Sequence, residues 1–122
     1  MRLGEIVSIV EGNMLFDADL DVEIPCASAA GLMSDVLAFA EPDSVLLTGL
    51  CNPQVVRTVE MADIAAIIFV RGKHPPSETV VLAKEKGIPL AITPYTMFEA
   101  CGRLYQAGLR GCDISSRIEP MK

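Results

Sequence analysis

The stretch of residues 64–104, IAAIIFVRGKHPPSETVVLAKEKGIPLAITPYTMFEACGRL, decides the fold. It opens with residues typical of a buried strand, turns at Gly72, and continues after two prolines as a helix that Gly87 ends. A second strand over 88–93 and a second helix follow with almost no spare residues. Connections this short between alternating strands and helices predict parallel strands, with the helices packed on the sheet faces.

The rest of the chain adds elements of the same kinds. In chain order we expect a helix over 3–10, a strand over 14–16, a half-exposed strand over 17–24, a helix over 32–39, a strand over 44–49 and a helix that begins at Asn52-Pro53. The side chains expected to face inward include Leu20, Val22, Ile24, Met97, Phe98 and Leu104. Thr96 and Glu99 have the spacing of a capping box.

These elements predict one α/β domain of three layers, α/β/α, with a mostly parallel sheet of about five strands. The domain is expected over residues 1–108. From residue 109 the apolar periodicity fades, and Gly, Ser and Pro residues predict a C-terminal surface tail over 109–122.

The composition excludes several classes of function. The net charge of −6 opposes binding to a phosphate backbone, so we expect no nucleic-acid partner. No apolar run approaches the roughly 18 residues of a membrane span, and the N-terminus lacks the apolar core of a signal peptide. We therefore expect a cytoplasmic protein without a membrane partner, whose thiols are reduced.

Four cysteines stand at positions 26, 51, 101 and 112, without a Cys-x-x-Cys pair and with one histidine in the chain. That spacing predicts no zinc site, and we expect no metal and no cofactor. Cys51 and Cys112 are the thiols expected to be exposed. Cys26 and Cys101 are expected to fill the core, since a free cysteine usually behaves as a small buried hydrophobe.

The sequence contains none of the searched catalytic motifs. It has no G-x-x-x-x-G-K-[ST] phosphate loop, no G-x-G-x-x-G fingerprint and no G-x-S-x-G elbow. A Cys-His couple would have to use His74, which lies in a turn. We therefore predict a protein that is not an enzyme.

Ligands of open parallel sheets bind outside the carboxyl ends of the strands, and this chain has polar residues there. Arg71, Lys73 and His74 form a cationic cluster before a helix, which could hold a phosphate or a carboxylate. The alternative is a solvated turn, because the two following prolines remove amides that a phosphate would use. The candidate ligand-binding residues are Thr48, Gly49, Asn52, Arg71, Gly72, Lys73, Thr93 and Tyr95.

Several segments together resemble the DRTGG domain family over about the first 108 residues. They are Met33-Ser34-Asp35-Val36-Leu37, Leu47-Thr48-Gly49, Ala66 to Gly72 with Pro76, Ala83 to Pro89, Thr93-Pro94-Tyr95 and Phe98-Glu99. The family is related to the N-terminal domain of HPr kinase/phosphorylase, and the chain lacks the Asp-Arg-Thr-Gly-Gly pentapeptide that gives it its name. The resemblance implies a three-layer domain like that N-terminal domain, commonly self-associating, with a regulatory or ligand-sensing role and no catalysis.

Two functional hypotheses follow. The first is a non-catalytic regulatory or assembly module, homodimeric and with a protein partner, which the missing catalytic motifs and the resemblance favour. Some stand-alone relatives accompany iron-hydrogenase genes in anaerobes, which implies a link to hydrogenase or energy metabolism. The second is a sensor of a small anion or nucleotide at the carboxyl edge of the sheet.

Overall fold

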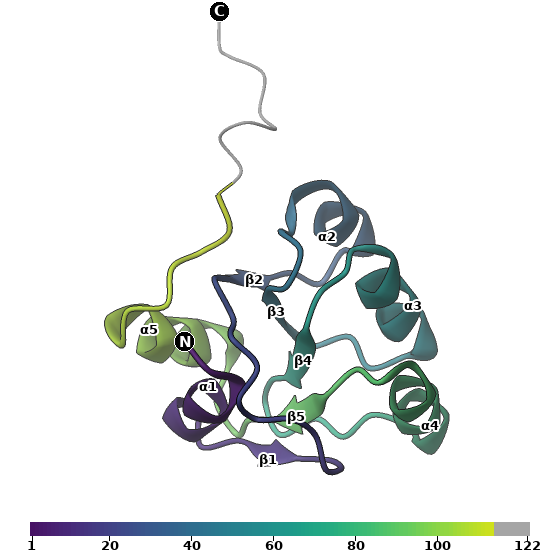
Figure 1. Ribbon diagram of the computed structural model, residues 1–122. Helices are drawn as coiled ribbons and strands as arrows, with labels where there is room; N and C mark the ends of the chain where they lie inside the picture. Colours follow the sequence, from purple (N-terminus) through teal and green to yellow (C-terminus); the bar gives the residue numbers. More distant parts are fainter. Residues whose placement is uncertain (114–122) are drawn as a thin grey trace, which may run out of the picture.

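The structure, a computed structural model, describes residues 1–113, which form a five-stranded sheet between two layers of helices (Figure 1). The elements are α1 (Leu3–Ile9), β1 (Asn13–Met14), β2 (Ala27–Ala29), α2 (Met33–Phe39), β3 (Val45–Thr48), α3 (Pro53–Met61), β4 (Ala66–Phe69), α4 (Ser77–Lys86), β5 (Leu90–Ile92) and α5 (Met97–Gln106). The strand order is β1-β5-β4-β3-β2, in which only β1 runs antiparallel to its neighbour. The predicted three-layer α/β fold is confirmed.

Each central strand sends alternate side chains into two separate cores, one on each face of the sheet. Leu47 and Ile68 point into the core that α1 and α5 cover. Leu46 and Ile67 point into the core beneath α2, α3 and α4. Strands buried on both faces are continuous in apolar residues, and this explains why β3 and β4 could be predicted from the sequence.

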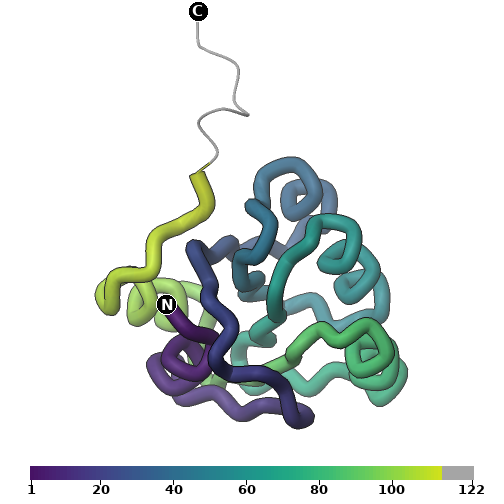
Figure 2. Tube along the Cα trace, viewed as in Figure 1, coloured from purple at the N-terminus to yellow at the C-terminus, as the bar shows by residue number. Residues whose placement is uncertain are grey.

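Residues 17–24 do not form the half-exposed strand that their alternation predicts. They run as an irregular segment beside α1 (Figure 2), where the Val22 and Leu20 carbonyls accept the first amides of α1, from Leu3 and Gly4, each at 2.9 Å. The prediction that Leu20 and Val22 face inward is wrong, since they are 43% and 37% exposed. Ile24 is buried as predicted. Residues 17–24 bind the start of α1 through backbone hydrogen bonds, so alternate side chains of this segment need not point into the core.

The helices begin where the sequence predicts, but some capping and packing details differ. The Thr96 hydroxyl accepts the Glu99 amide at 3.3 Å, whereas the Glu99 carboxylate accepts from the Arg103 guanidinium at 2.9 Å instead of completing the box. Asn52 precedes α3 as predicted, yet its side chain makes no capping hydrogen bond. Phe98, expected inside, is 80% exposed, because Ala100 and Leu104 form the inward face of α5.

The chain returns to the sheet after α5. Leu109 is buried in the core beneath α1 and α5, and Gly111 forms an isolated parallel bridge with Ala27 of β2. Residues 109–113 of the predicted surface tail therefore pack on the domain, and residues 114–122 lie outside the described part of the chain. No helix in residues 1–113 is long and apolar enough to cross a membrane.

Candidate functional site

Three loops meet at the carboxyl edge of the sheet. Each follows one central strand and leads into a helix: residues 49–52 join β3 to α3, residues 70–76 join β4 to α4, and residues 93–96 join β5 to α5. Because β3, β4 and β5 are parallel and adjacent, the amino ends of these three helices lie at one edge. Helix amino ends carry partial positive charge and favour anions nearby.

The turn at Arg71 and Gly72 ties two of these loops together. Both residues have left-handed backbone, with φ of 61° and 64°. The Arg71 amide donates to the Tyr95 carbonyl at 2.7 Å, and the Gly72 amide donates to the Thr93 carbonyl at 2.8 Å. A left-handed arginine is strained and persists where its surroundings hold it, as these two bonds do here.

The Arg71 side chain extends toward the end of β3. Arg71 Nη2 lies close to the backbone of Gly49. A Cβ atom built on Gly49 would lie only 2.9 Å from this nitrogen. Gly49 therefore leaves room for the guanidinium. Arg71 and Lys73 also act on Cys51: burial raises the pKa of the Cys51 thiol, and the positive charges of Lys73 and Arg71 partly oppose that rise.

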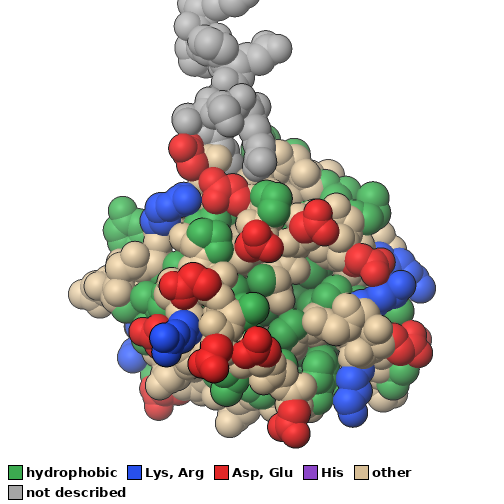
Figure 3. Space-filling model, viewed as in Figure 1, with side chains coloured by type: hydrophobic (Ala, Val, Ile, Leu, Met, Phe, Trp, Pro, Cys, Tyr) green, Lys and Arg blue, Asp and Glu red, His purple; other side chains and the backbone are tan. Residues whose placement is uncertain are grey.

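Arg71 and Lys73 are exposed, and neither forms an ion pair with any residue in the range 1–113. The two cations stand two positions apart in one loop of a chain whose net charge is −6. Figure 3 shows acidic side chains distributed across the face drawn there. The carboxyl edge therefore combines two unneutralised cations with the starts of α3 and α4, a setting that favours a negatively charged ligand.

The predicted polar residues occupy this edge in different ways. The buried Thr93 hydroxyl donates to the Val10 carbonyl at 2.7 Å and accepts the Tyr95 amide at 3.2 Å, so it holds the loop. The Thr48 hydroxyl is buried and accepts the Leu50 amide at 3.1 Å, so it holds the loop after β3. Asn52 is exposed at the start of α3, with its side-chain amide available.

Tyr95 is half-buried and its ring lies under a cation. The Arg103 guanidinium carbon is 4.2 Å from the centre of that ring. The Tyr95 backbone holds Arg71 while its ring packs beside α5, so Tyr95 connects the Arg71 turn to the face of the sheet that α5 covers.

A large hollow lies at the opposite, amino edge of the sheet. Its volume is about 740 Å³, and its lining includes Ala65 before β4 and Pro89 before β5. The charged residues in its lining are Asp17, Asp19, Asp43, Glu60, Asp63, Lys84 and Lys86. Carboxylates outnumber lysines there, and Lys86 is already paired with Glu60 at 3.3 Å. Its charge disfavours an anionic ligand.

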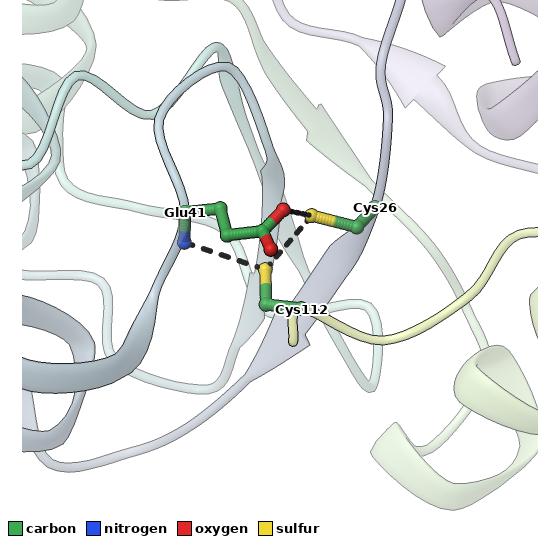
Figure 4. A group of neighbouring side chains, drawn as sticks. All are labelled: Cys26, Glu41 and Cys112. Carbon is green, nitrogen blue, oxygen red and sulfur yellow. Dashed lines mark hydrogen bonds between the residues drawn. The ribbon is translucent and has the colours of Figure 1, made fainter. Parts of the chain in front are cut away.

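The cysteines are arranged differently from the prediction. Cys51, expected to be exposed, is buried under the carboxyl edge, and Cys101 is half-buried. Cys26 is buried as predicted, but it meets Glu41 and Cys112 in a cluster (Figure 4). Spacing along the chain could not reveal this cluster, because 86 positions separate the two cysteines.

Among comparisons with known proteins, the one with solved structures supports the fold. No protein-family model and no curated protein matches the chain. The structure is similar to a crystal structure of the CBS and DRTGG domains of the regulatory region of a Clostridium perfringens pyrophosphatase, complexed with its activator diadenosine tetraphosphate. The TM-score is 0.66 at 14% identity, over 97% of this chain and 50% of that one. This chain thus spans half the length of its structural neighbour, and the likeness supports a DRTGG-like fold.

Proposed function

We propose that this chain is a non-catalytic regulatory module that senses a small anionic ligand, of the nucleotide or phosphorylated-metabolite class, at the carboxyl edge of its sheet. The observation that carries the proposal is the Arg71 turn. A strained backbone, fixed by two hydrogen bonds, presents a cation that no described carboxylate neutralises. Strain of this kind is concentrated at functional sites. The other described non-glycine residues with left-handed backbone are Glu11, Asp43 and Asp63, so Arg71 alone among them presents a cation.

The chemistry of the edge suits phosphate oxygens. Arg71 offers a planar fork of donors that can bind two oxygens at once, and Lys73 adds a compact charge. The exposed side-chain amide of Asn52 would donate to a further oxygen, and the buried Thr48 would position the loop after β3. Thr93, Gly49 and Gly72 would position the loops, and Tyr95 would hold the Arg71 backbone.

The structural neighbour favours a regulatory role. That structure is of a regulatory region in complex with an activator that has a tetraphosphate chain. A domain of the same fold, with free cations at a strand edge and no phosphate loop in its sequence, fits sensing better than phosphoryl transfer. We place this module in the cytoplasm, where nucleotides and phosphorylated metabolites are abundant.

Thermal unfolding with candidate ligands tests the proposal. A ligand that binds only the folded state at a hundredfold excess over Kd stabilises it by about 2.7 kcal/mol. We expect a rise in Tm with inorganic phosphate, ATP or diadenosine tetraphosphate, lost in Arg71→Ala and reduced in Lys73→Ala. Arg57→Ala, which removes an exposed arginine within α3, is the matched control and should keep the rise. No rise with any compound, or an equal loss in the control, would contradict the proposal.

A second candidate function is assembly, by homodimerisation through α5. Phe98 and Tyr105 lie seven positions apart on one helix face, are 80% and 75% exposed, and have Gly102 between them. Two aromatic rings beside a glycine form an apolar surface of the type that helices bury against each other. Sedimentation should show a dimer that Phe98→Ser dissociates. A monomer at every concentration would exclude this role.

The proposal also includes a protein partner and a metabolic pathway. The resemblance to stand-alone DRTGG proteins points to a protein partner in hydrogenase or energy metabolism of an anaerobe. Native mass spectrometry of the purified chain would detect a bound partner or ligand directly.

A further inference from the structure

Three segments far apart in the sequence converge at the amino edge of the sheet, away from the Arg71 turn. Cys26 immediately precedes β2, Glu41 follows α2, and Cys112 belongs to the segment after α5. Backbone bonds fix this meeting: Ala27 donates to the Arg110 carbonyl at 2.9 Å, and Cys112 donates to the Ala27 carbonyl at 3.0 Å. The convergence is therefore part of the fold.

The three side chains point toward one another (Figure 4). The Cys26 thiol donates to Glu41 Oε2 at 2.9 Å, and the two sulfur atoms are 3.0 Å apart. All three donor atoms lie within 4.8 Å of one another. Cys26 is buried, whereas Cys112 and Glu41 are half-buried, so the cluster is open to solvent on one side.

The surroundings hold these groups in place. The backbone carbonyl of Glu41 accepts a hydrogen bond from the Ser44 hydroxyl at 2.7 Å. In the Glu41 side chain, Oε1 accepts a hydrogen bond from the Asp113 amide at 3.1 Å. The remaining Oε2 faces Cys26. The Glu41 amide donates to the Cys112 sulfur at 3.5 Å, which fixes the position of that sulfur. Outer contacts of this kind orient the ligands of metal sites.

We propose that Cys26, Glu41 and Cys112 bind a thiophilic divalent cation, Zn²⁺ in particular. Two sulfurs and one carboxylate oxygen are donors that Zn²⁺ accepts, whereas Mg²⁺ and Ca²⁺ require oxygen ligands alone. The described residues supply three of the four ligands of a tetrahedral site. Arg110, whose Nη2 lies 3.5 Å from Glu41 Oε2, would offset the negative charge that two thiolates and a carboxylate leave around a dication.

Little movement is needed to admit the ion. With Zn–S near 2.3 Å and Zn–O near 2.1 Å, tetrahedral geometry places the sulfurs about 3.8 Å apart and sulfur and oxygen about 3.6 Å apart. The present separations of 3.0 Å and 2.9 Å would each open by less than about 1 Å. Rotation of the half-buried Cys112 side chain can provide much of this change. The bound ion would fasten the segment after α5 to β2.

Cobalt is a spectroscopic probe for such a site. The reduced full chain, titrated anaerobically with Co²⁺, should develop a thiolate-to-cobalt charge-transfer band that saturates at one ion per chain and disappears on addition of Zn²⁺. Cys112→Ser should abolish the band, and Glu41→Gln should weaken Co²⁺ affinity at least about tenfold, since even outer contacts cost that much. Cys101→Ser, which removes the half-buried thiol of α5, is the control and should keep the band.

A second measurement does not depend on any variant folding. In the unsubstituted chain, Zn²⁺ should protect Cys26 and Cys112 from alkylation and leave the rates of Cys51 and Cys101 unchanged, as peptide mass spectrometry would report. Absence of the cobalt band while all four thiols are reduced would overturn the proposal. So would protection of a different pair. The anion proposal at the opposite edge is unaffected by either result.

Discussion

At the scale of single residues, the position of Arg71 depends on a residue that has no side chain. A Cβ on Gly49 would lie 2.9 Å from Arg71 Nη2. Since that atom is the free end of a flexible side chain, Gly49→Ala should change the free energy of unfolding by less than about 1 kcal/mol. It should nevertheless displace the guanidinium and weaken anion binding. Chemical denaturation and the ligand-induced Tm shift measure the two effects separately, and a large loss of stability with intact binding would refute this role.

The pKa of the Cys51 thiol depends on the charges of Lys73 and Arg71. Burial raises its pKa, and Lys73 and Arg71 partly oppose the rise. Lys73→Ala should therefore raise the pKa further, and so should a bound anion. The pKa of this thiol is higher in the folded protein than in the unfolded protein. Its contribution to stability is therefore complete at pH values below the unfolded pKa, and it is lost as the pH rises through the folded pKa.

Alkylation of Cys51 as a function of pH, followed by peptide mass spectrometry, measures this pKa from the midpoint of the rate profile. Arg57→Ala should leave the midpoint unchanged. A midpoint that stays the same or falls in Lys73→Ala would mean that the charge of Lys73 does not lower the pKa of Cys51.

Residue positions at the carboxyl edge could be predicted from the sequence, but their partners could not. Thr93 stands at a strand end, as a ligand-binding threonine would, yet its hydroxyl donates to Val10, 83 positions away. Whether a polar side chain has a hydrogen-bond partner inside the protein depends on how distant segments pack. The spacing of residues along the sequence does not show that packing.

At the scale of elements, two helix starts offer a matched comparison. Thr96 accepts the Glu99 amide and Asn52 accepts none, although both precede a helix. Thr96→Ala should destabilise the domain by about 1 kcal/mol, and Asn52→Ala should cost much less. Urea unfolding of the two variants gives both values. Equal costs would show that Asn52 caps α3 in solution.

The strands that are buried on both faces are the easiest elements to predict from the sequence. β3, β4 and β5 are buried throughout because helices cover both faces, and apart from Thr48 at the end of β3 their residues are apolar. Residues 17–24 also alternate like a strand, but their backbone is bonded to the start of α1 rather than to a neighbouring strand. Apolar periodicity does not distinguish these two uses of an extended segment.

At the scale of the whole molecule, residues beyond α5 contribute to the core. Leu109 is 4% exposed, in contact with the core that α1 and α5 cover. Leu109→Ala should lower the free energy of unfolding by about 2–5 kcal/mol. Leu37→Ala, at a half-exposed position of α2, should cost less than about 1 kcal/mol. If both cost the same in urea unfolding, residues 109–113 would be dispensable, as a domain boundary at residue 108 implies.

Neither the segment after α5 nor the cysteine cluster could be predicted from the sequence, for the same reason. The bridge between Ala27 and Gly111 brings Cys112 to Cys26, and a contact across 86 positions leaves no local periodicity. The carboxyl-edge residues differ in this respect, because alternating strands and helices fix where strand ends lie.

Residue-resolved NMR shows whether a small anion binds at the carboxyl edge of the sheet. A ¹⁵N-labelled chain is titrated with diadenosine tetraphosphate, and with inorganic phosphate in parallel. We predict that the amide signals of Gly49, Gly72 and Lys73 shift in a saturable way, and that Arg71→Ala abolishes the shifts. Saturable shifts confined to the opposite edge, around Asp43 and Gly87, or no saturable shifts with either compound, would contradict the account.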